Sequence, residues 1–124
     1  MPFILQPPDH DYAIRSVRDG AIVVNDRTLT ESFYLSPDAL HEGWPPRDLD
    51  SLSIQDMAGP LALEPEVILL GTGSRQRFPA AALLAACLTR GIGIEVMANA
   101  AAARTFSVLA NEGRRVVAAF LLGG

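Results

Sequence analysis

The chain has 124 residues, of which 49% are hydrophobic and 19% charged, a balance typical of one globular domain and not of a disordered segment. The net charge of −4 and the pI of about 5.0 argue against a nucleic-acid-binding protein. The single cysteine excludes an internal disulfide, and no apolar run is long enough to insert into a membrane. The first residues match neither a secretory signal nor a transit peptide, so we expect a cytoplasmic protein.

The first third of the chain predicts an arm and three short strands. Residues 1–11 contain three prolines and show no periodicity, which favours an extended arm. The pattern from Tyr12 to Val17 predicts one strand, and residues 21–24 and 33–35 predict two more. We expect these strands to join the main sheet in antiparallel orientation.

The segment of residues 36–50 is irregular, because prolines and a glycine interrupt any long element. Trp44 in this segment is expected to fill the edge of the core. Ser53 and Asp56 have the spacing of a capping box, in which each side chain accepts a hydrogen bond from the other residue's backbone. A short helix is expected from there to about Leu61.

The second half of the chain predicts a strand–helix–strand–helix–strand unit over residues 66–121. Residues 67–70 form the apolar run of a strand buried on both faces, and residues 92–97 and 116–121 predict two further strands. Helical crossovers join parallel strands. The sequence therefore predicts an α/β fold: a three-layer single domain over residues 1–124, with a mixed, largely parallel central sheet.

Two helices separate these strands. Good helix formers occupy residues 80–90, with Pro79 expected as the first helical residue. Asn99 is expected as the N-cap of the second helix, which extends to about Glu112. Gly91 is expected as the left-handed residue that closes the first helix, and Gly113 is expected to end the second.

The Gly71–Arg77 loop is the first candidate site, because it follows a buried strand and precedes a helix. Its glycines allow a ligand close to the backbone, and Arg75 and Arg77 add positive charge. Two glycines after a strand are also the ordinary pattern of a turn without a ligand. The loop lacks the third glycine of a dinucleotide fingerprint and the Lys-Ser/Thr of a P-loop. An anion or acidic-peptide site and a structural turn both stay open.

The second candidate is a group of cations on the last helix and just after it. Arg104 lies within the helix, whereas Arg114 and Arg115 follow its end, where the helix dipole favours positive charge. Glu112 is placed to pair with Arg114. The alternative to this structural role is a surface that binds a partner.

No residues form a catalytic or metal-binding pattern. Cys87 lies in an apolar helix, which favours core packing over nucleophilic chemistry. His10 and His41 are far apart, and Glu64 and Glu66 suit a solvated entry to a strand. We expect no catalytic residue, no metal ligand and no cofactor.

Motifs of the second half resemble those of a known family. Residues 67–73 followed by Arg77-Phe78-Pro79 resemble its first signature, and residues 94–97, 103–106 and 109–114 resemble its second. This family of unknown function includes mitochondrial complex I assembly factor three and many small bacterial proteins. The chain departs from the family pattern at Phe106 and Ser107, where Tyr and Asn are common, and at Asn99, where Thr is common.

The resemblance implies a three-layer α/β fold and, for the mitochondrial member, a non-enzymatic assembly factor that binds subunits of complex I. Positions that match the family pattern form a candidate shared surface: Gly71, Thr72, Gly73, Arg77, Arg104, Glu112 and Arg114. We therefore expect a non-enzymatic binding or assembly-accessory protein whose partner is another protein. The alternative is a binder of, or an enzyme acting on, a small anionic ligand at the Gly71–Arg77 loop.

Overall fold

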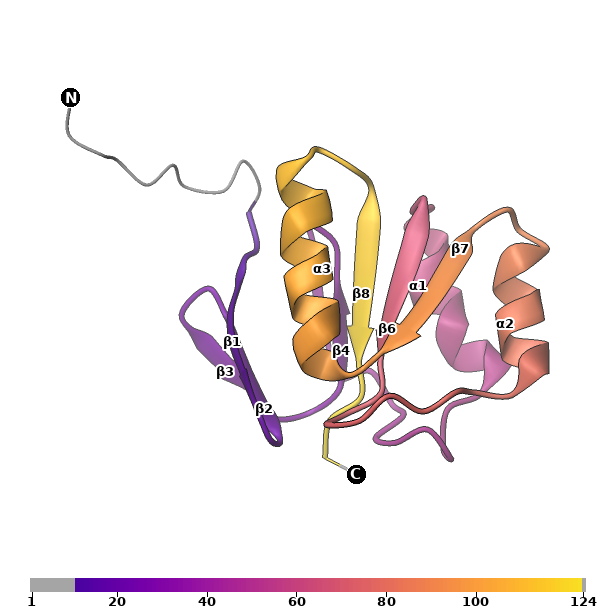
Figure 1. Ribbon diagram of the computed structural model, residues 1–124, viewed down its shortest axis with the longest axis horizontal. Helices are drawn as coiled ribbons and strands as arrows, with labels where there is room; N and C mark the ends of the chain where they lie inside the picture. Colours follow the sequence, from indigo (N-terminus) through magenta and orange to yellow (C-terminus); the bar gives the residue numbers. More distant parts are fainter. Residues whose placement is uncertain (1–10, 124) are drawn as a thin grey trace.

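The computed structural model describes residues 11–123, which form two sheets and the helices that pack on them (Figure 1). Of the predicted arm, only Asp11 lies within the described residues, and its amide donates a hydrogen bond of 3.0 Å to the carbonyl of Pro37. The α/β class and the mixed sheet predicted from the sequence are confirmed.

The larger sheet has five strands in the order β5-β4-β8-β6-β7. Strands β6, β7 and β8 are parallel, whereas β4 pairs antiparallel with both β8 and β5. Its strands are β4 (Phe33–Leu35), β5 (Leu40–Glu42), β6 (Val67–Gly71), β7 (Gly93–Met97) and β8 (Val116–Phe120). The hairpin of β4 and β5 was not predicted, because Pro37 and Gly43 concealed a three-residue strand in the segment of residues 36–50.

A separate antiparallel sheet contains β1 (Ile14–Arg18), β2 (Ala21–Val24) and β3 (Arg27–Leu29). The prediction that the first strands extend the main sheet is therefore wrong for β1 and β2, and β3 was not predicted. The reason is visible in β2, where Ile22 and Val24 are buried and Ala21 and Val23 are partly exposed. This one-sided apolar face covers α3 (Asn99–Asn111) instead of continuing the larger sheet.

The remaining helices are η1 (Ile54–Met57), α1 (Ala58–Ala62) and α2 (Ala81–Leu88). The capping box of Ser53 and Asp56 is confirmed in full. Two predicted helix starts are wrong. Helix α2 begins after its N-cap Ala80, which leaves Pro79 outside it, and the N-cap of α3 is Ala98. Gly91 has the predicted left-handed conformation, with a φ of +72°, and Gly113, which ends α3 as predicted, is left-handed too, with a φ of +76°.

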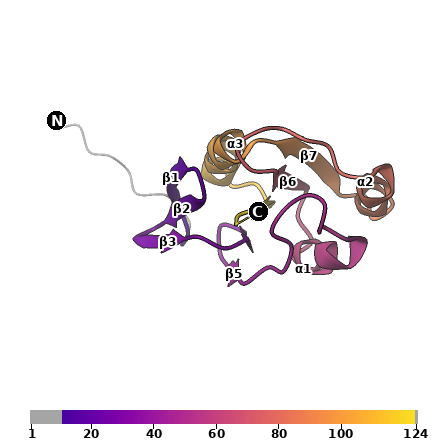
Figure 2. The same cartoon turned by 90° about the horizontal axis from the view of Figure 1, so that it is seen from below.

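The two faces of the larger sheet have separate cores. Leu69, Ala118 and Phe120 face α3 and the smaller sheet, so α3 lies between two sheets. On the opposite face, Ile68 and Leu70 pack with α1, α2 and the buried Cys87. Figure 2 shows α3 and the smaller sheet at one end of the molecule and α1 and α2 at the other.

The edge of the core is filled as predicted by Trp44, which is 6% exposed. Its indole Nε1 donates a hydrogen bond of 2.8 Å to the carbonyl of Asp56, so the aromatic ring is buried with its polar atom satisfied.

Candidate functional site

The Gly71–Arg77 loop begins at a tightly packed junction of β6, α3 and β8. Gly71 is buried at the end of β6, where an added Cβ would overlap Asn99 Oδ1 and lie 3.0 Å from Phe120 Cδ1. A hydrogen bond of 3.0 Å from the amide of Leu121 reaches the carbonyl of Gly71. Glycine is thus needed here for space, and not for an unusual φ.

Asn99 joins the three elements of this junction. Its Oδ1 accepts a hydrogen bond of 3.1 Å from the amide of Gly73, and its Nδ2 donates one of 3.1 Å to the carbonyl of Leu121. The backbone amide of Asn99 donates a further bond of 2.8 Å to the carbonyl of Gly73. The residue is 4% exposed, so these partners replace water. Asn99 is therefore a clamp between β6, α3 and β8, and the predicted N-cap role is wrong.

Thr72 holds the outer part of the loop in shape. Its hydroxyl donates a hydrogen bond of 2.7 Å to the carbonyl of Arg75 and accepts one of 3.1 Å from the amide of Arg77. Gly73 has a φ of +97°, which side chains rarely adopt. The loop is thus a preformed turn, and the Thr72 hydroxyl proton is directed at the chain itself.

A groove of about 460 Å³ lies beside this turn, at the carboxyl ends of β6 and β8. Its walls come from the Gly71–Arg77 loop, from residues 17–20 around the β1–β2 turn, from residues 47–49 and from residues 121–123 after β8. Ala100 in the first turn of α3 also lines it. The first amides of a helix have no hydrogen-bond partner within the helix, and the N-terminus carries partial positive charge. The amino end of α3 therefore adds to the positive character of the groove.

The groove is rich in guanidinium groups. Arg18, Arg47, Arg75 and Arg77 line it, and all four are exposed, against two carboxylates, Asp19 and Asp48. The cations come from segments that are far apart in the sequence, so the fold alone brings them together. Arginine presents a planar fork of donors that matches a carboxylate or phosphate in a bidentate geometry.

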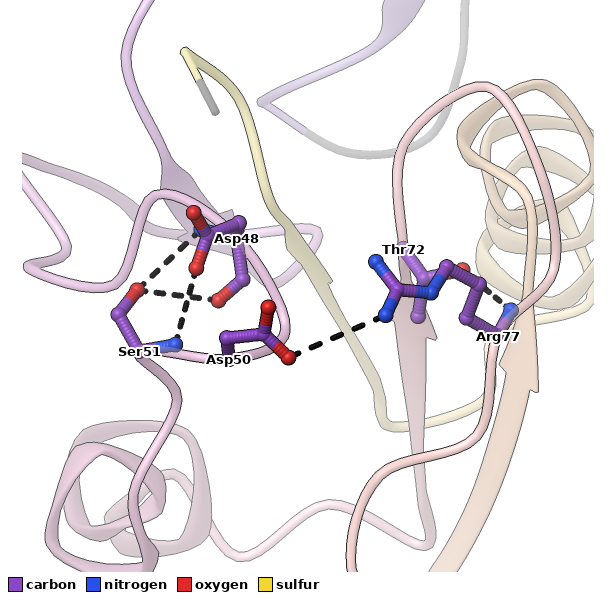
Figure 3. A network of polar contacts seen from close by, with 5 residues as sticks. All are labelled: Asp48, Asp50, Ser51, Thr72 and Arg77. Carbon is purple, nitrogen blue, oxygen red and sulfur yellow. Dashed lines mark hydrogen bonds and ion pairs between the residues drawn. The ribbon is translucent and has the colours of Figure 1, made fainter.

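Across the groove, Arg77 faces an acidic turn (Figure 3). Arg77 Nη2 lies 3.9 Å from Asp50 Oδ1, and both side chains are mostly exposed. The neighbouring Asp48 accepts a hydrogen bond of 2.9 Å from the amide of Ser51, and this bond, with the nearby charge of Arg77, lowers the pKa of the Asp48 carboxyl. An exposed pair at this separation is weak, which leaves Arg77 available to another anion.

The cations predicted on and after the last helix do not line this groove. Arg104 borders a shallow hollow between α3 and β1. Arg114 lies at the amino end of β8, opposite the Gly71–Arg77 loop, and its Nε donates a hydrogen bond of 3.1 Å to Glu66 Oε2. The predicted partner Glu112 is instead the exposed C-cap of α3. The structure therefore does not bring Arg104, Glu112 and Arg114 together with the Gly71–Arg77 loop into the single surface that the sequence predicted.

Sequence reasoning missed three residues of the groove region. Arg18 is the last residue of β1 and Arg47 lies in the irregular segment of residues 36–50, and neither has a local pattern that indicates a shared surface. The partners of Asn99 are 26 and 22 residues away along the chain, so only the tertiary structure reveals its role. Within residues 11–123, we find no helix with the length and apolar character needed to cross a bilayer.

Comparison with protein-family models gives a match over residues 14–121 to a family described as "Protein of unknown function (DUF498/DUF598)". Among solved structures, a Xanthomonas campestris protein is 54% identical, with a TM-score of 0.85 over 100% of this chain and 94% of that chain. A Bordetella pertussis protein, described as a Mth938-like domain, is 29% identical, with a TM-score of 0.84 over 100% of this chain and 94% of that chain.

One curated relative is the "13 kDa major membrane protein" of Francisella tularensis subsp. holarctica. It is 33% identical over 69 residues, which cover 56% of this chain and 56% of that protein. The match thus spans about half the length of the curated relative.

Proposed function

Because this chain belongs to the DUF498/DUF598 family, which includes mitochondrial complex I assembly factor three, we propose that it is a non-enzymatic binding protein of the accessory or assembly type. Its partner is another protein, and the groove beside the Gly71–Arg77 loop receives an anionic group of that partner. An Asp or Glu side chain has the size and charge for this position. A link to the assembly of a respiratory complex is part of the same proposal and comes from the mitochondrial relative.

The observation that carries this proposal is the gathering of Arg18, Arg47, Arg75 and Arg77 around one groove in a protein of net charge −4. Exposed like charges repel, so four guanidinium groups around one hollow favour occupation by an anion. The turn behind them is held by Thr72 and Asn99, which means that binding does not require the loop to be ordered first.

Affinity capture from the native host tests this function. Wild-type chain and Arg115→Ala, an exposed arginine outside the groove lining, are expected to recover the same partner in equal amounts. The double variant Arg75→Ala/Arg77→Ala is expected to lose it, because it removes two of the four cations. Equal recovery with this double variant contradicts the groove as the interface.

A small anionic ligand at the same groove, bound alone or as a substrate, is the second candidate. The observation in its favour is the groove volume of about 460 Å³, which lies within the roughly 300–1,000 Å³ of small-molecule sites. A ligand at 100 times its dissociation constant adds about 2.7 kcal/mol to the free energy of unfolding. A thermal-shift screen with phosphate, citrate and nucleotides, at matched ionic strength, is expected to raise the Tm of wild type and not of Arg75→Ala/Arg77→Ala. A flat response in wild type excludes this candidate.

The proposed site of action is the cytoplasm. The Francisella relative is named a membrane protein, so the two locations are worth separating by experiment. Fractionation of native cells is expected to recover this chain in the supernatant after high-speed centrifugation. Recovery in the membrane pellet that resists a salt wash contradicts the proposed location.

A further inference from the structure

A second hollow, the seam hollow, has a volume of about 270 Å³ and lies between strand β1 and helix α3. Its lining comes from residues 14–17 of β1 and from Ala100, Ala103, Arg104 and Ser107 of α3. The charged side chains of this described lining are Arg15 and Arg104, and both are exposed. Within residues 11–123, neither of them forms an ion pair. Two unpaired cations from different elements therefore share one small hollow whose described lining contains no carboxylate.

An irregularity of β1 places Arg15 at this hollow. The register between β1 and β2 shifts between Ile14 and Ser16, so Arg15 is an extra residue on the β1 side of the pair. Bulges of this kind change the direction of a side chain and are common next to active sites. Of the strands in the smaller sheet, β1 lies nearest to α3 (Figure 2). Among the described residues it pairs with β2 alone, so its other edge has no neighbouring strand.

The seam hollow adjoins the groove beside the Gly71–Arg77 loop, because Val17 and Ala100 line both. Arg104 follows Ala100 by four residues, which is about one turn of α3 and about 6 Å along its axis. On the facing strand, Arg18 lines the groove and Arg15 lines the seam hollow. Exposed cations thus continue from the groove along the seam, although Arg104 does not line the groove itself.

We propose that the seam hollow binds a second acidic side chain of the partner protein whose first acidic side chain occupies the groove. This inference rests on the proposed function, since one partner covers both places. The partner contributes an extended segment with Asp or Glu at alternate positions. Alternate side chains of an extended segment point to the same side and lie about 6.6 Å apart. This spacing matches the turn of α3 that separates Ala100, at the shared border, from Arg104.

Charge and backbone geometry both favour this occupant. Two guanidinium groups without a partner repel each other, and a carboxylate between them reverses the sign of the interaction. The planar donors of arginine also match a carboxylate in a bidentate geometry. The unpaired edge of β1 offers backbone hydrogen bonds to an extended segment, which is a common way for a sheet to bind a peptide.

Two capped peptides test the proposal at physiological ionic strength. The two-acid peptide is Ser-Glu-Ser-Glu-Ser, and the one-acid peptide has Gln in place of the second Glu. Wild type is expected to bind the two-acid peptide about fivefold more tightly, which is the scale of one exposed ion pair. The amide NMR signals of Arg15 and Arg104 are expected to shift with the two-acid peptide and not with the one-acid peptide. Equal affinities for the two peptides overturn the proposal.

Matched double variants locate the second contact. Arg15→Ala/Arg104→Ala is expected to remove the preference for the two-acid peptide and to leave the affinity for the one-acid peptide unchanged. Arg90→Ala/Arg115→Ala also removes two exposed arginines, but from outside both linings, and is expected to keep the preference. Arg104→Ala alone is expected to reduce the preference without affecting any buried side chain. Equal preferences in the two double variants overturn the assignment.

Failure of this proposal is distinguishable from failure of the proposed function. If one-acid binding requires Arg75 and Arg77 while the loss of Arg15 and Arg104 has no effect on either peptide, the groove stands and the seam hollow is overturned. If wild type binds neither peptide, both are overturned.

A membrane surface is the remaining occupant to test. Vesicles with anionic headgroups, at the same ionic strength, are expected to leave the amide signals of Arg15 and Arg104 unchanged. Larger shifts with vesicles than with the two-acid peptide would assign the seam hollow to a lipid surface and overturn the proposal.

Discussion

The inner and outer sides of the Gly71–Arg77 loop are built differently. On the inner side, Asn99 is buried, both polar ends of its side chain have partners, and Gly71 leaves no space for a Cβ. On the outer side, Arg77 and Asp50 are exposed and lie 3.9 Å apart. The same short segment thus combines a rigid support with loosely held charges.

This difference separates stability from binding. Substitutions on the inner side should change the free energy of unfolding, because they disturb buried hydrogen bonds or close packing. Substitutions on the outer side should leave stability nearly unchanged, since exposed ion pairs contribute little. The following predictions test that separation, from the largest expected effect to the smallest.

Gly71→Ala should have the largest effect. The new Cβ overlaps Asn99 Oδ1 and crowds Phe120, so the clamp must shift or break. We expect a loss of about 3 kcal/mol in the free energy of unfolding, measured by urea denaturation. The control is Gly93→Ala on β7, where an added Cβ would lie 3.7 Å from the carbonyl oxygen of Glu66 and from a methyl group of Val67, an ordinary contact distance. Similar losses in both variants would mean that the effect of Gly71→Ala is that of replacing any strand glycine, and not of the clash with Asn99.

Asn99→Ala should destabilise the protein by about 2 kcal/mol, because the amide of Gly73 and the carbonyl of Leu121 each lose a partner in a poorly hydrated place. Thermal unfolding measures the change. Asn111→Ala, at the exposed end of α3, is the comparison within the same helix and should cost less. A larger loss for Asn111→Ala would remove the clamp role of Asn99.

Thr72→Val should cost about 1 kcal/mol, because it removes the hydroxyl that bonds Arg75 and Arg77 while preserving the shape of the side chain. Hydrogen exchange of the Arg77 amide should become faster, while that of amides in β6 stays unchanged. Unaltered exchange at Arg77 would show that the turn keeps its shape without the hydroxyl.

Asp50→Asn and Asp48→Asn should have the smallest effects on the free energy of unfolding at neutral pH, because both carboxylates are exposed and solvent screens their interactions. Asp48 carries a pH dependence, since its pKa is lowered in the folded state, chiefly by the Ser51 amide. Its contribution is present above the pKa of the unfolded chain and is lost as pH falls through the lower, folded value. Urea midpoints of wild type should therefore fall slightly more than those of Asp48→Asn under acid conditions, and parallel curves would contradict this.

Much of the fold was determined by local pattern in the sequence. The apolar run at residues 67–70 and the strand–helix alternation after it predicted β6, α2, β7, α3 and β8. The capping box at Ser53 and the glycines after α2 and α3 were also correct, because each depends on residues within one turn of the chain. The choice of Gly71, Thr72 and Gly73 as a distinctive loop came from the same local information.

Only the tertiary structure decided the rest. The smaller sheet separates from the larger one because its apolar face covers α3, which no short segment reveals. Arg18 and Arg47 join Arg75 and Arg77, while Arg104 and Arg114 do not, because strand direction and loop path determine which distant residues meet. Asn99 has the residue type of a cap, yet its partners lie more than 20 residues away. Hydrogen bonds within one turn of the chain depend on neighbouring residues and can be predicted from the sequence. Shared surfaces depend on the packing of distant segments, which only the tertiary structure shows.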